Sequence, residues 1–319
     1  MNNLFVKIKE SRWTLILLPF VILLVIALIF GLLTNGVFLG IRNLNVIFQQ
    51  AMIIGIVATG ACFIFATNNR NIAMGSCTAL VATVAALAYN ATGSIFVLFA
   101  VSIVFGVLVM LFCVMLSTVL NVKIIHVTIV MMHLLKAIQT EIVGGGAISI
   151  SYDMTSAMNR AYVPYILLGV FLLFCIILFH FTRVGRHIKM VGANSNSAEL
   201  TGLQTKRALL IAFILGGIGA GLGALLIIFR TGSITSFTGS GMNTDVMLAI
   251  VLGGMPVYGG TRSKAYAPIL GAITVAALNN GLLMVGVSNA YIQGVRGIIF
   301  LILLLVGNKR TVLLPSREA

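Results

Sequence analysis

The chain has 319 residues, of which 60% are hydrophobic and only 8% are charged. A water-soluble domain of this length needs a much larger charged surface, so the composition excludes one. The net charge of +14 does not indicate nucleic-acid binding, because basic residues beside apolar spans are what the positive-inside rule predicts. We therefore expect an all-α polytopic membrane protein, in which each helix satisfies its own backbone hydrogen bonds.

Ten apolar windows are the candidate membrane helices. In chain order they are 14–33, 44–66, 72–89, 94–120, 122–143, 163–182, 208–229, 245–258, 266–285 and 290–307. Most of them reach the roughly 20 residues that a bilayer requires. The window 245–258 is short and ends in glycines, so it is either a broken span or a re-entrant element. No linker or soluble segment separates the windows, and residues 1–319 are expected to form one transmembrane domain.

The basic residues predict the orientation of these spans. With an inside N-terminus and ten crossings, the outside connections carry only Arg42 and Arg160. Most other Lys and Arg residues then lie on the inside, which is the bias expected of cytoplasmic connections. Both termini are thus predicted to be cytoplasmic. Two five-helix halves would then have opposite orientations, as in the inverted repeats of many transporters, although no residue-level repeat supports this.

The chain offers little that could carry covalent chemistry or ion coupling. Among its six acidic residues, Glu141 and Asp245 are expected near outer span ends, and none sits clearly at mid-membrane. This argues against a proton- or sodium-coupled carrier, which usually needs a buried ionisable group. No catalytic set and no metal site stands out. No phosphate-binding loop occurs either, so ATP-driven transport would need another chain to bind the ATP.

Neutral polar residues in or beside the spans are candidates for a translocation pathway. The four that we single out are Gln49, Asn71, Asn279 and Asn280. Uncharged donors and acceptors would suit a neutral, hydroxyl-rich solute. The alternative is hydrogen bonding between helices, because a buried amide is costly unless it is paired.

Glycines mark two further features. Gly217 with Gly221, and Gly219 with Gly223, have the spacing that lets helices approach closely. A second group breaks a helix at a predicted cytoplasmic boundary and consists of Gly253, Gly254, Gly259 and Gly260. It is either a tight interfacial turn or a flexible joint that contacts a partner.

The longest polar run lies between Arg183 and Arg207, on the predicted cytoplasmic side. Asn196 and Glu199 have the spacing of a capping box, and Gly202 would end the helix in the C′ position. The run therefore predicts a short helix at about 197–201, between the sixth and seventh spans.

Residues 183–307 resemble the membrane permease subunits of bacterial ABC importers for ribose, xylose, galactose and related sugars. The matching stretches are Gly185-Arg186, Val191-Gly192-Ala193-Asn194, Ser197-Ala198, Thr201-Gly202-Leu203, Val251-Leu252-Gly253-Gly254, Gly259-Gly260 and Leu278-Asn279-Asn280-Gly281-Leu282. The first half of the chain matches mainly in its span pattern and in Gly75-Ser76. The order and spacing of the matching stretches in 183–307 are more specific than any one stretch alone.

The resemblance implies a ten-span permease domain in the bacterial cytoplasmic (inner) membrane. Its partners would be a second permease subunit, cytoplasmic ATP-binding cassette ATPases and an extracytoplasmic sugar-binding protein, with membrane lipid around it and no nucleic acid. This chain would hold no cofactor, since the ATPase binds the ATP. The resemblance also implies that 194–203 is a coupling helix that docks on the ATPase, and its residues are Asn194, Ser197, Ala198, Glu199, Gly202 and Leu203. Of these, Glu199 is better explained as a helix cap than as a contact.

Departures from the family pattern leave the assembly open. Relatives usually carry an acidic residue where this chain has Asn71, and often a Glu where Asn243 stands. Such changes would suit one half of a heterodimeric permease pair, whereas a homodimer is the other arrangement. The alternative functions are a secondary transporter of small polar solutes and a channel-like protein without energy coupling.

Overall fold

The computed structural model describes residues 12–256 and 258–308, and almost all of its regular structure is helical. The helices are α2 (Arg12–Leu33), η1 (Val37–Leu39), α3 (Ile41–Ala66), α4 (Met74–Thr92), α5 (Ile95–Val119), α6 (Ile124–Val143), α7 (Tyr152–Arg160), α8 (Val163–Phe181), α9 (Arg183–Ala193), α10 (Ser195–Leu200), α11 (Thr205–Thr231), α12 (Met242–Leu252), α13 (Ala267–Met284) and α14 (Asn289–Asn308). Each of the ten predicted windows overlaps one of these helices.

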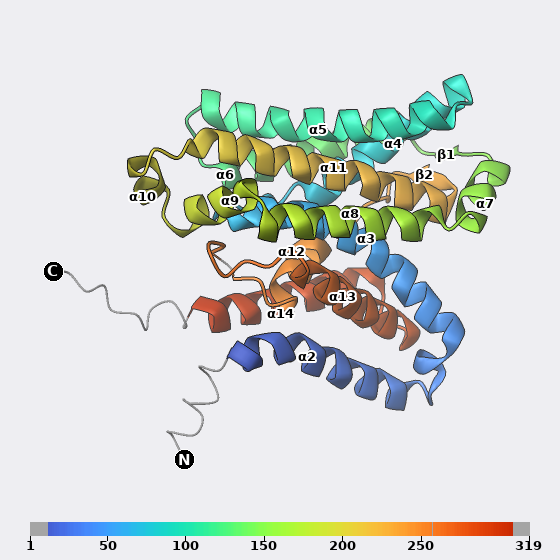
Figure 1. The fold of residues 1–319 in the computed structure, drawn as a ribbon. Helices are drawn as coiled ribbons and strands as arrows, with labels where there is room; N and C mark the ends of the chain where they lie inside the picture. Colours follow the sequence, from blue (N-terminus) through green and yellow to red (C-terminus); the bar gives the residue numbers. More distant parts are fainter. Residues whose placement is uncertain (1–11, 257, 309–319) are drawn as a thin grey trace, which may run out of the picture.

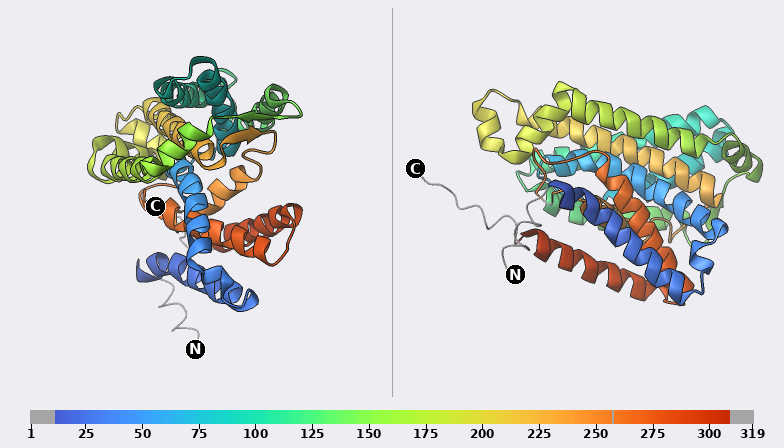
Figure 2. Two further views of the ribbon diagram at one scale, coloured as in Figure 1. Left: turned by 90° about the vertical axis from the view of Figure 1, so that its right-hand side faces the viewer. Right: turned by 60° about the horizontal axis from the view of Figure 1, so that its bottom comes forward.

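The long helices run side by side along one axis of the molecule (Figures 1 and 2). In the described residues, six of them are long and apolar enough to cross a membrane: α3, α4, α5, α8, α11 and α13. The most apolar stretches of α3 and α11 are each 83% buried, whereas those of α5 and α8 are only 28% and 22% buried. The prediction of a polytopic helical membrane protein is therefore confirmed, with α3 and α11 at its centre and α5 and α8 at its surface.

Glycines let α11 pack closely on two sides, as their spacing predicts. A Cβ on Gly221 would collide with the Ser102 carbonyl oxygen of α5, and one on Gly219 would lie 2.9 Å from the Cα of Gly60 in α3. The backbones of these helices thus touch directly, and dispersion contacts replace the hydrophobic effect that lipid cannot supply.

The end of the molecule opposite α10 carries structure that the sequence did not predict (Figure 1). Strands β1 (Ala147–Ser149) and β2 (Ser233–Thr235) form an antiparallel pair in which Ile148 lies opposite Ile234. Asn90 of α4 donates a hydrogen bond of 3.0 Å to the Ser149 carbonyl, which fixes the pair over the end of α4.

After β2 the chain turns into the bundle instead of starting a full span. On α6, Lys136 donates to the carbonyls of Ser236 (2.6 Å) and Thr238 (3.1 Å). Farther along, Asn243 bonds to Ser76, which lies 14 residues before Asn90 in α4, or about 20 Å by helix rise. Helix α12 therefore begins deep inside the molecule, and its 11 residues span about 16 Å, roughly half of a bilayer core.

This geometry bears on two expectations. The window 245–258 was expected to be a broken span or a re-entrant element, and α12 does end at Leu252, before the glycines. The expectation that Asp245 lies near an outer span end is wrong. The segment 236–241 carries the chain inward first, so that Asp245 in the first turn of α12 is buried in the interior.

Candidate functional site

A short helix, α10, projects at one end of the bundle between α9 and α11 (Figure 1). It begins earlier than expected, since it spans Ser195–Leu200 and its N-cap is Asn194. The Asn194 side-chain oxygen accepts a hydrogen bond of 3.1 Å from the Ser197 backbone N–H, which satisfies one of the free donors of the first turn. Asn194 is extended, with φ −160°, as an N-cap requires.

The predicted capping box of Asn196 and Glu199 is wrong. Asn196 lies inside the helix, and the Glu199 carboxylate accepts a hydrogen bond of 2.6 Å from the Thr205 hydroxyl at the start of α11. Glu199 thus ties α10 to α11 instead of closing its own first turn.

The C-terminal end of α10 follows the prediction. Gly202 has φ +79°, a left-handed conformation that glycine adopts without a steric penalty. The Gly202 N–H donates to the Glu199 carbonyl (2.9 Å), and the Leu203 N–H donates to the Ala198 carbonyl (3.1 Å). These two bonds form a Schellman motif, which satisfies carbonyls that the helix leaves free. Six residues are held as a helix because both ends are capped.

The two apolar side chains of α10 point in opposite directions. Ala198 is 4% exposed and packs against the bundle, whereas Leu200 is 89% exposed. Leu200 was not among the residues singled out from the sequence. Its residue type could have identified it, since Leu200 is the only large apolar residue between Asn194 and Gly202. Leu200 is thus the large apolar side chain that α10 presents at its exposed surface.

The base of α10 is fixed to the core through glycine. A Cβ on Gly192, near the end of α9, would overlap the carbonyl oxygen of Ala66, the last residue of α3. The same carbonyl accepts a hydrogen bond of 3.1 Å from Gly260. Three segments therefore meet at Ala66: the helix that leads to α10, the end of the central helix α3, and the predicted glycine turn.

The glycine turn is shaped by this contact. Three of its four glycines have positive φ angles, namely Gly254 (89°), Gly259 (65°) and Gly260 (83°). Gly253 instead packs on the Ala267 carbonyl at the start of α13. The turn thus connects α12 to α13 and lies directly on the end of α3. Its described part is therefore a tight, packed turn.

Lys189 holds α9 from the other side. Its ammonium lies 4.6 Å from the centre of the Phe179 ring in α8, a favourable cation–π distance. Burial lowers the pKa of Lys189, because the charged form loses water. Lys189 therefore faces the bundle, unlike the exposed Arg183 and Arg186 of the same helix.

The proposed pathway residues do not come together. Gln49 is exposed on α3, and the side-chain oxygen of Asn280 is buried without a hydrogen bond. The Asn71 oxygen accepts from the Ala73 N–H (2.9 Å), and its amide nitrogen lies 3.0 Å from the Met110 sulfur. Asn71 therefore caps and packs the start of α4.

Asn279 belongs to a buried network that sequence reasoning missed. Arg296 of α14 forms an ion pair of 3.1 Å with Asp245 of α12, and the two side chains are 10% and 8% exposed. The Asn279 oxygen accepts from Arg296 Nε (2.8 Å), while its amide nitrogen donates to Asp245 (3.3 Å). Gly241 leaves room for the guanidinium, since a Cβ there would overlap an Arg296 nitrogen. The charges of α12 and α14 thus neutralise each other inside the bundle.

A second polar contact joins α4 and α12. The Asn243 side chain accepts a hydrogen bond of 2.9 Å from the Ser76 N–H and donates one of 2.9 Å to the Ser76 hydroxyl. Gly75 allows this approach, because a Cβ on it would lie 2.5 Å from the Asn243 backbone nitrogen.

Comparisons with known proteins agree with this architecture. A family model described as "Branched-chain amino acid transport system / permease component" matches residues 43–304. The ribose import permease protein RbsC of Escherichia coli (strain K12) is 27% identical to the chain, over 91% of this chain and 92% of that protein. The autoinducer 2 import system permease protein LsrC of Photorhabdus laumondii subsp. laumondii is 26% identical, over 89% and 87% respectively. No solved structure matches. Since the family model covers most of the sequence, the chain belongs to this family of transport-system permease components.

Proposed function

We propose that the chain is the membrane-spanning subunit of an ATP-driven importer for a sugar or a similarly polar neutral solute. The names of the ribose and autoinducer 2 permeases support this substrate class. Two such subunits, alike or different, would pair with cytoplasmic ATPases and an extracytoplasmic sugar-binding protein. The chain itself would bind no ATP and would cross the inner membrane ten times, with both termini and α10 on the cytoplasmic side.

The observation that carries the proposal is α10. A six-residue helix is too short to be stable alone, yet here it is capped at both ends and displays Leu200. The chain has no phosphate-binding loop of its own, so energy from ATP would have to enter through a contact with another protein. We assign that contact to the exposed face of α10, with Leu200 as the side chain that enters the ATPase.

The junction at Ala66 supplies a route from this contact to the spans. Movement of α10 is transmitted to α9, whose Gly192 lies directly on the end of α3. The glycine turn lies on the same carbonyl and leads into α12 and α13. Closure of the ATPases would therefore push on the central helix and on the half-length helix together. This contact would shift the population between states that open to opposite sides of the membrane.

Contacts between the two halves support an inverted repeat. If α2–α6 and α8–α14 are the halves, α3 corresponds to α11 and α4 to α12. These corresponding helices pack against each other: Gly60 meets Gly219, and Ser76 meets Asn243. Contacts between corresponding helices are what a pseudo-two-fold axis through the centre would produce.

A secondary transporter is the alternative that one observation favours. Asp245 is a buried carboxylate, and its burial removes the argument that no ionisable group lies inside the bundle. However, Arg296 already neutralises the Asp245 carboxylate. A coupling site instead needs a carboxylate that binds and releases a proton or a sodium ion during transport. The ATP-driven importer remains the better explanation, and the energy source separates the two.

The test is solute uptake by the assembled complex in proteoliposomes. We expect uptake of radiolabelled ribose that requires ATP and the sugar-binding protein, and no uptake of leucine. Leu200→Glu should abolish ATP-dependent uptake without preventing membrane insertion, while the matched variant Leu200→Met should retain it. Uptake driven by a proton gradient without ATP would establish the secondary transporter instead, and selective leucine uptake would overturn the substrate class.

A further inference from the structure

A basic surface lies beside α10, on α9 and the start of α11. The residues 183–207 hold Arg183, Arg186, Lys189, Lys206 and Arg207 but only one acidic residue. Glu199 is that residue, and its carboxylate is already bound to the Thr205 hydroxyl. The one ion pair found among residues 12–256 and 258–308 is the distant Asp245–Arg296 pair. The cations of this surface therefore have no acidic partner within the described chain.

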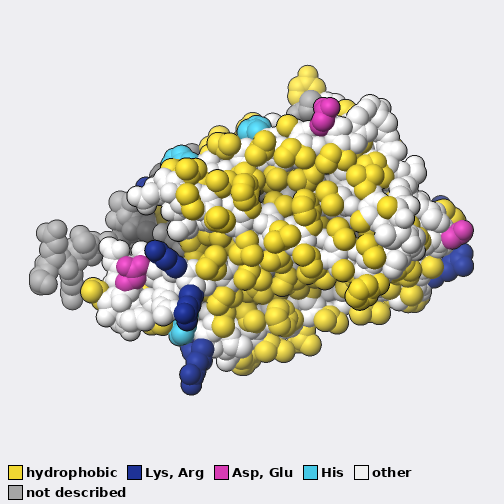
Figure 3. All heavy atoms as spheres, turned by 90° about the horizontal axis from the view of Figure 1, so that it is seen from above, with side chains coloured by type: hydrophobic (Ala, Val, Ile, Leu, Met, Phe, Trp, Pro, Cys, Tyr) yellow, Lys and Arg dark blue, Asp and Glu magenta, His cyan; other side chains and the backbone are white. Residues whose placement is uncertain are grey.

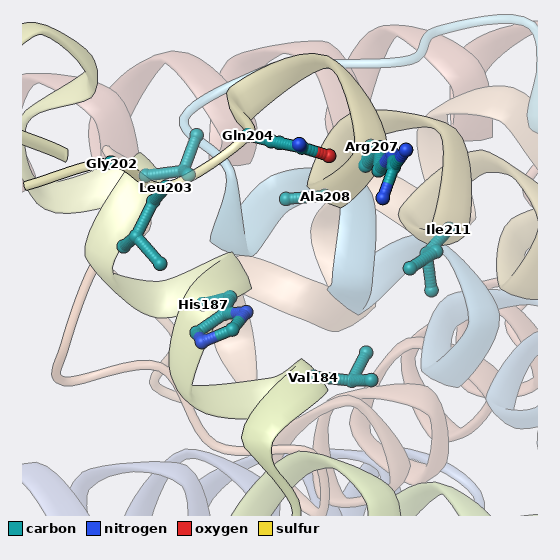
Figure 4. Close-up of a pocket in the computed structure, with 9 residues that line it drawn as sticks. Val184, His187, Gly202, Leu203, Gln204, Arg207, Ala208 and Ile211 are labelled. Carbon is teal, nitrogen blue, oxygen red and sulfur yellow. The ribbon is translucent and has the colours of Figure 1, made fainter. Parts of the chain in front are cut away.

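A pocket of about 330 Å³ opens within this surface, between α9 and α11. Figure 4 shows Val184 and His187 on the α9 wall, and Arg207 and Ile211 on the α11 wall. The segment that caps α10 closes one end through Gly202. Polar groups thus lie at the rim, and aliphatic side chains line the depth.

Helical spacing places a second arginine, Arg183, near the rim. Arg183 lies one turn before His187 on α9, so the two side chains share a side of the helix, and both are exposed. Arg183, His187 and Arg207 are therefore placed around one opening. Lys189 points the other way, to Phe179.

The pocket sits where the apolar surface of the protein begins. The apolar run of α11 starts at Ala208, directly after Arg207, and Leu210 is exposed. On the neighbouring α8, the last residue Phe181 is 74% exposed. In Figure 3, basic side chains lie at the two ends of the face that is shown, with a broad hydrophobic area between them. In a bilayer that covers this hydrophobic area, the rim of the pocket would lie at headgroup level and its aliphatic depth at acyl-chain level.

We propose that this pocket binds one anionic phospholipid from the leaflet on the α10 side of the membrane. The phosphodiester would lie between Arg183, His187 and Arg207, and the first part of an acyl chain would lie against Val184 and Ile211. Basic pockets between membrane helices are suited to such headgroups. Arg183 and Arg207 attract the phosphate, His187 offers it a hydrogen-bonding ring nitrogen, and the aliphatic lining needs an apolar occupant. An anionic lipid supplies both groups in one molecule.

The site goes beyond solute transport and has a consequence for it. Leu203 lines the pocket, and its N–H closes the C-terminal cap of α10. A bound lipid would therefore rest against the base of the helix that we assign to the ATPase contact. Lipid composition would then influence how firmly α10 is held.

Native mass spectrometry of the delipidated full-length chain tests the proposal. The probes are dioleoyl-phosphatidylglycerol and dioleoyl-phosphatidylcholine, which share their acyl chains. We expect one phosphatidylglycerol to bind about 25-fold more tightly than phosphatidylcholine, since Arg183 and Arg207 each add about a fivefold preference for anionic lipid. Equal binding of the two lipids would overturn the site.

Variants locate the binding. Arg183→Gln combined with Arg207→Gln should remove the preference for phosphatidylglycerol, whereas Arg42→Gln combined with Arg160→Gln removes two cations elsewhere and should leave it unchanged. Gln204→Glu adds a negative charge at an exposed position of the rim. It should weaken phosphatidylglycerol binding about fivefold without affecting folding. Wild-type binding by the double variant or by Gln204→Glu would contradict the proposal.

Two further arms distinguish other occupants. Glycerol phosphate in excess should not displace the lipid, and complete displacement would show a simple anion site instead. The measurement is then repeated on the complex with its ATPase. Retention of phosphatidylglycerol supports the lipid site, whereas its loss on assembly would show that the ATPase occupies the pocket. None of these measurements depends on which solute is transported.

Discussion

Arg296 is the residue through which α14 is fixed to the interior of the bundle. It bonds to Asp245 and Asn279, on two different helices. Replacing Arg296 with Met would leave the buried Asp245 carboxylate without its counter-charge. Because removing one partner of a buried pair typically costs about 3–5 kcal/mol, we expect Arg296→Met to lower the stability of the protein by that order. Thermal unfolding in detergent measures the change.

A double variant separates the charge from the packing. Asp245→Asn together with Arg296→Met removes both charges and leaves Asn279 an amide partner. Most of the lost stability should return, since replacing both members of a buried pair is often close to neutral. If Arg296→Met alone unfolded like the wild type, the ion pair would have no structural role.

Asp245 shows why the position of a single residue could not be predicted from the sequence. The depth of Asp245 depends on how far the preceding segment enters the bundle, and that is fixed by Lys136 on α6, a hundred positions away. The prediction of the N-cap of α10 was wrong for a different reason. Asn194 and Asn196 are equally good caps by type, and only the backbone conformation decides between them. By contrast, Gly202 was predictable, because few residues other than glycine adopt its φ angle.

Helices α9 and α3 meet at a contact that leaves no room for a side chain. A methyl group on Gly192 would meet the Ala66 backbone, which cannot move aside as a flexible side chain does. We expect Gly192→Ala to separate α9 from α3, at a stability cost of about 1–3 kcal/mol, and to reduce uptake strongly while the ATPase still binds. Co-purification of the ATPase and ATP-dependent uptake provide the two measurements.

Gly169 provides the matched control. It lies within α8, and nothing is within 4 Å of a Cβ built on it. Gly169→Ala should fold and transport normally, with a gain of up to about 1 kcal/mol in helix propensity. Normal uptake by Gly192→Ala would show that the junction does not transmit movement.

Elements were predictable where they are long and apolar. The window 208–229 identified α11, because an apolar run of about 20 residues has the length of a membrane-spanning helix and is rare in soluble proteins. Strands β1 and β2 had no such signal: each has three residues, and each is a strand only because the other, more than 80 residues away, pairs with it. Helix α12 was only half predicted, since an apolar run shows that a segment is buried but not whether it is helical to its end.

The whole molecule has two distinct ends, and this arrangement can be tested without any transport assay. Helix α10 lies at one end, together with the described start of α2 and end of α14, whereas α7, β1 and β2 lie at the other (Figure 1). The positive-inside bias predicts that the α10 end lies in the cytoplasm. Leu200 and Tyr152, which are 89% and 78% exposed, are suitable positions for a label at each end.

We expect a membrane-impermeant maleimide to label Leu200→Cys only in inside-out vesicles and Tyr152→Cys only in right-side-out vesicles. The unmodified chain is the control, because Cys62, Cys77, Cys113 and Cys175 are all buried and should not react. Labelling of both variants from the same side would mean that the helices between them do not cross the membrane as proposed. Labelling of each variant from the opposite side would invert the orientation. That result would place α10 out of reach of a cytoplasmic ATPase, and the importer mechanism would then be wrong even though the fold is right.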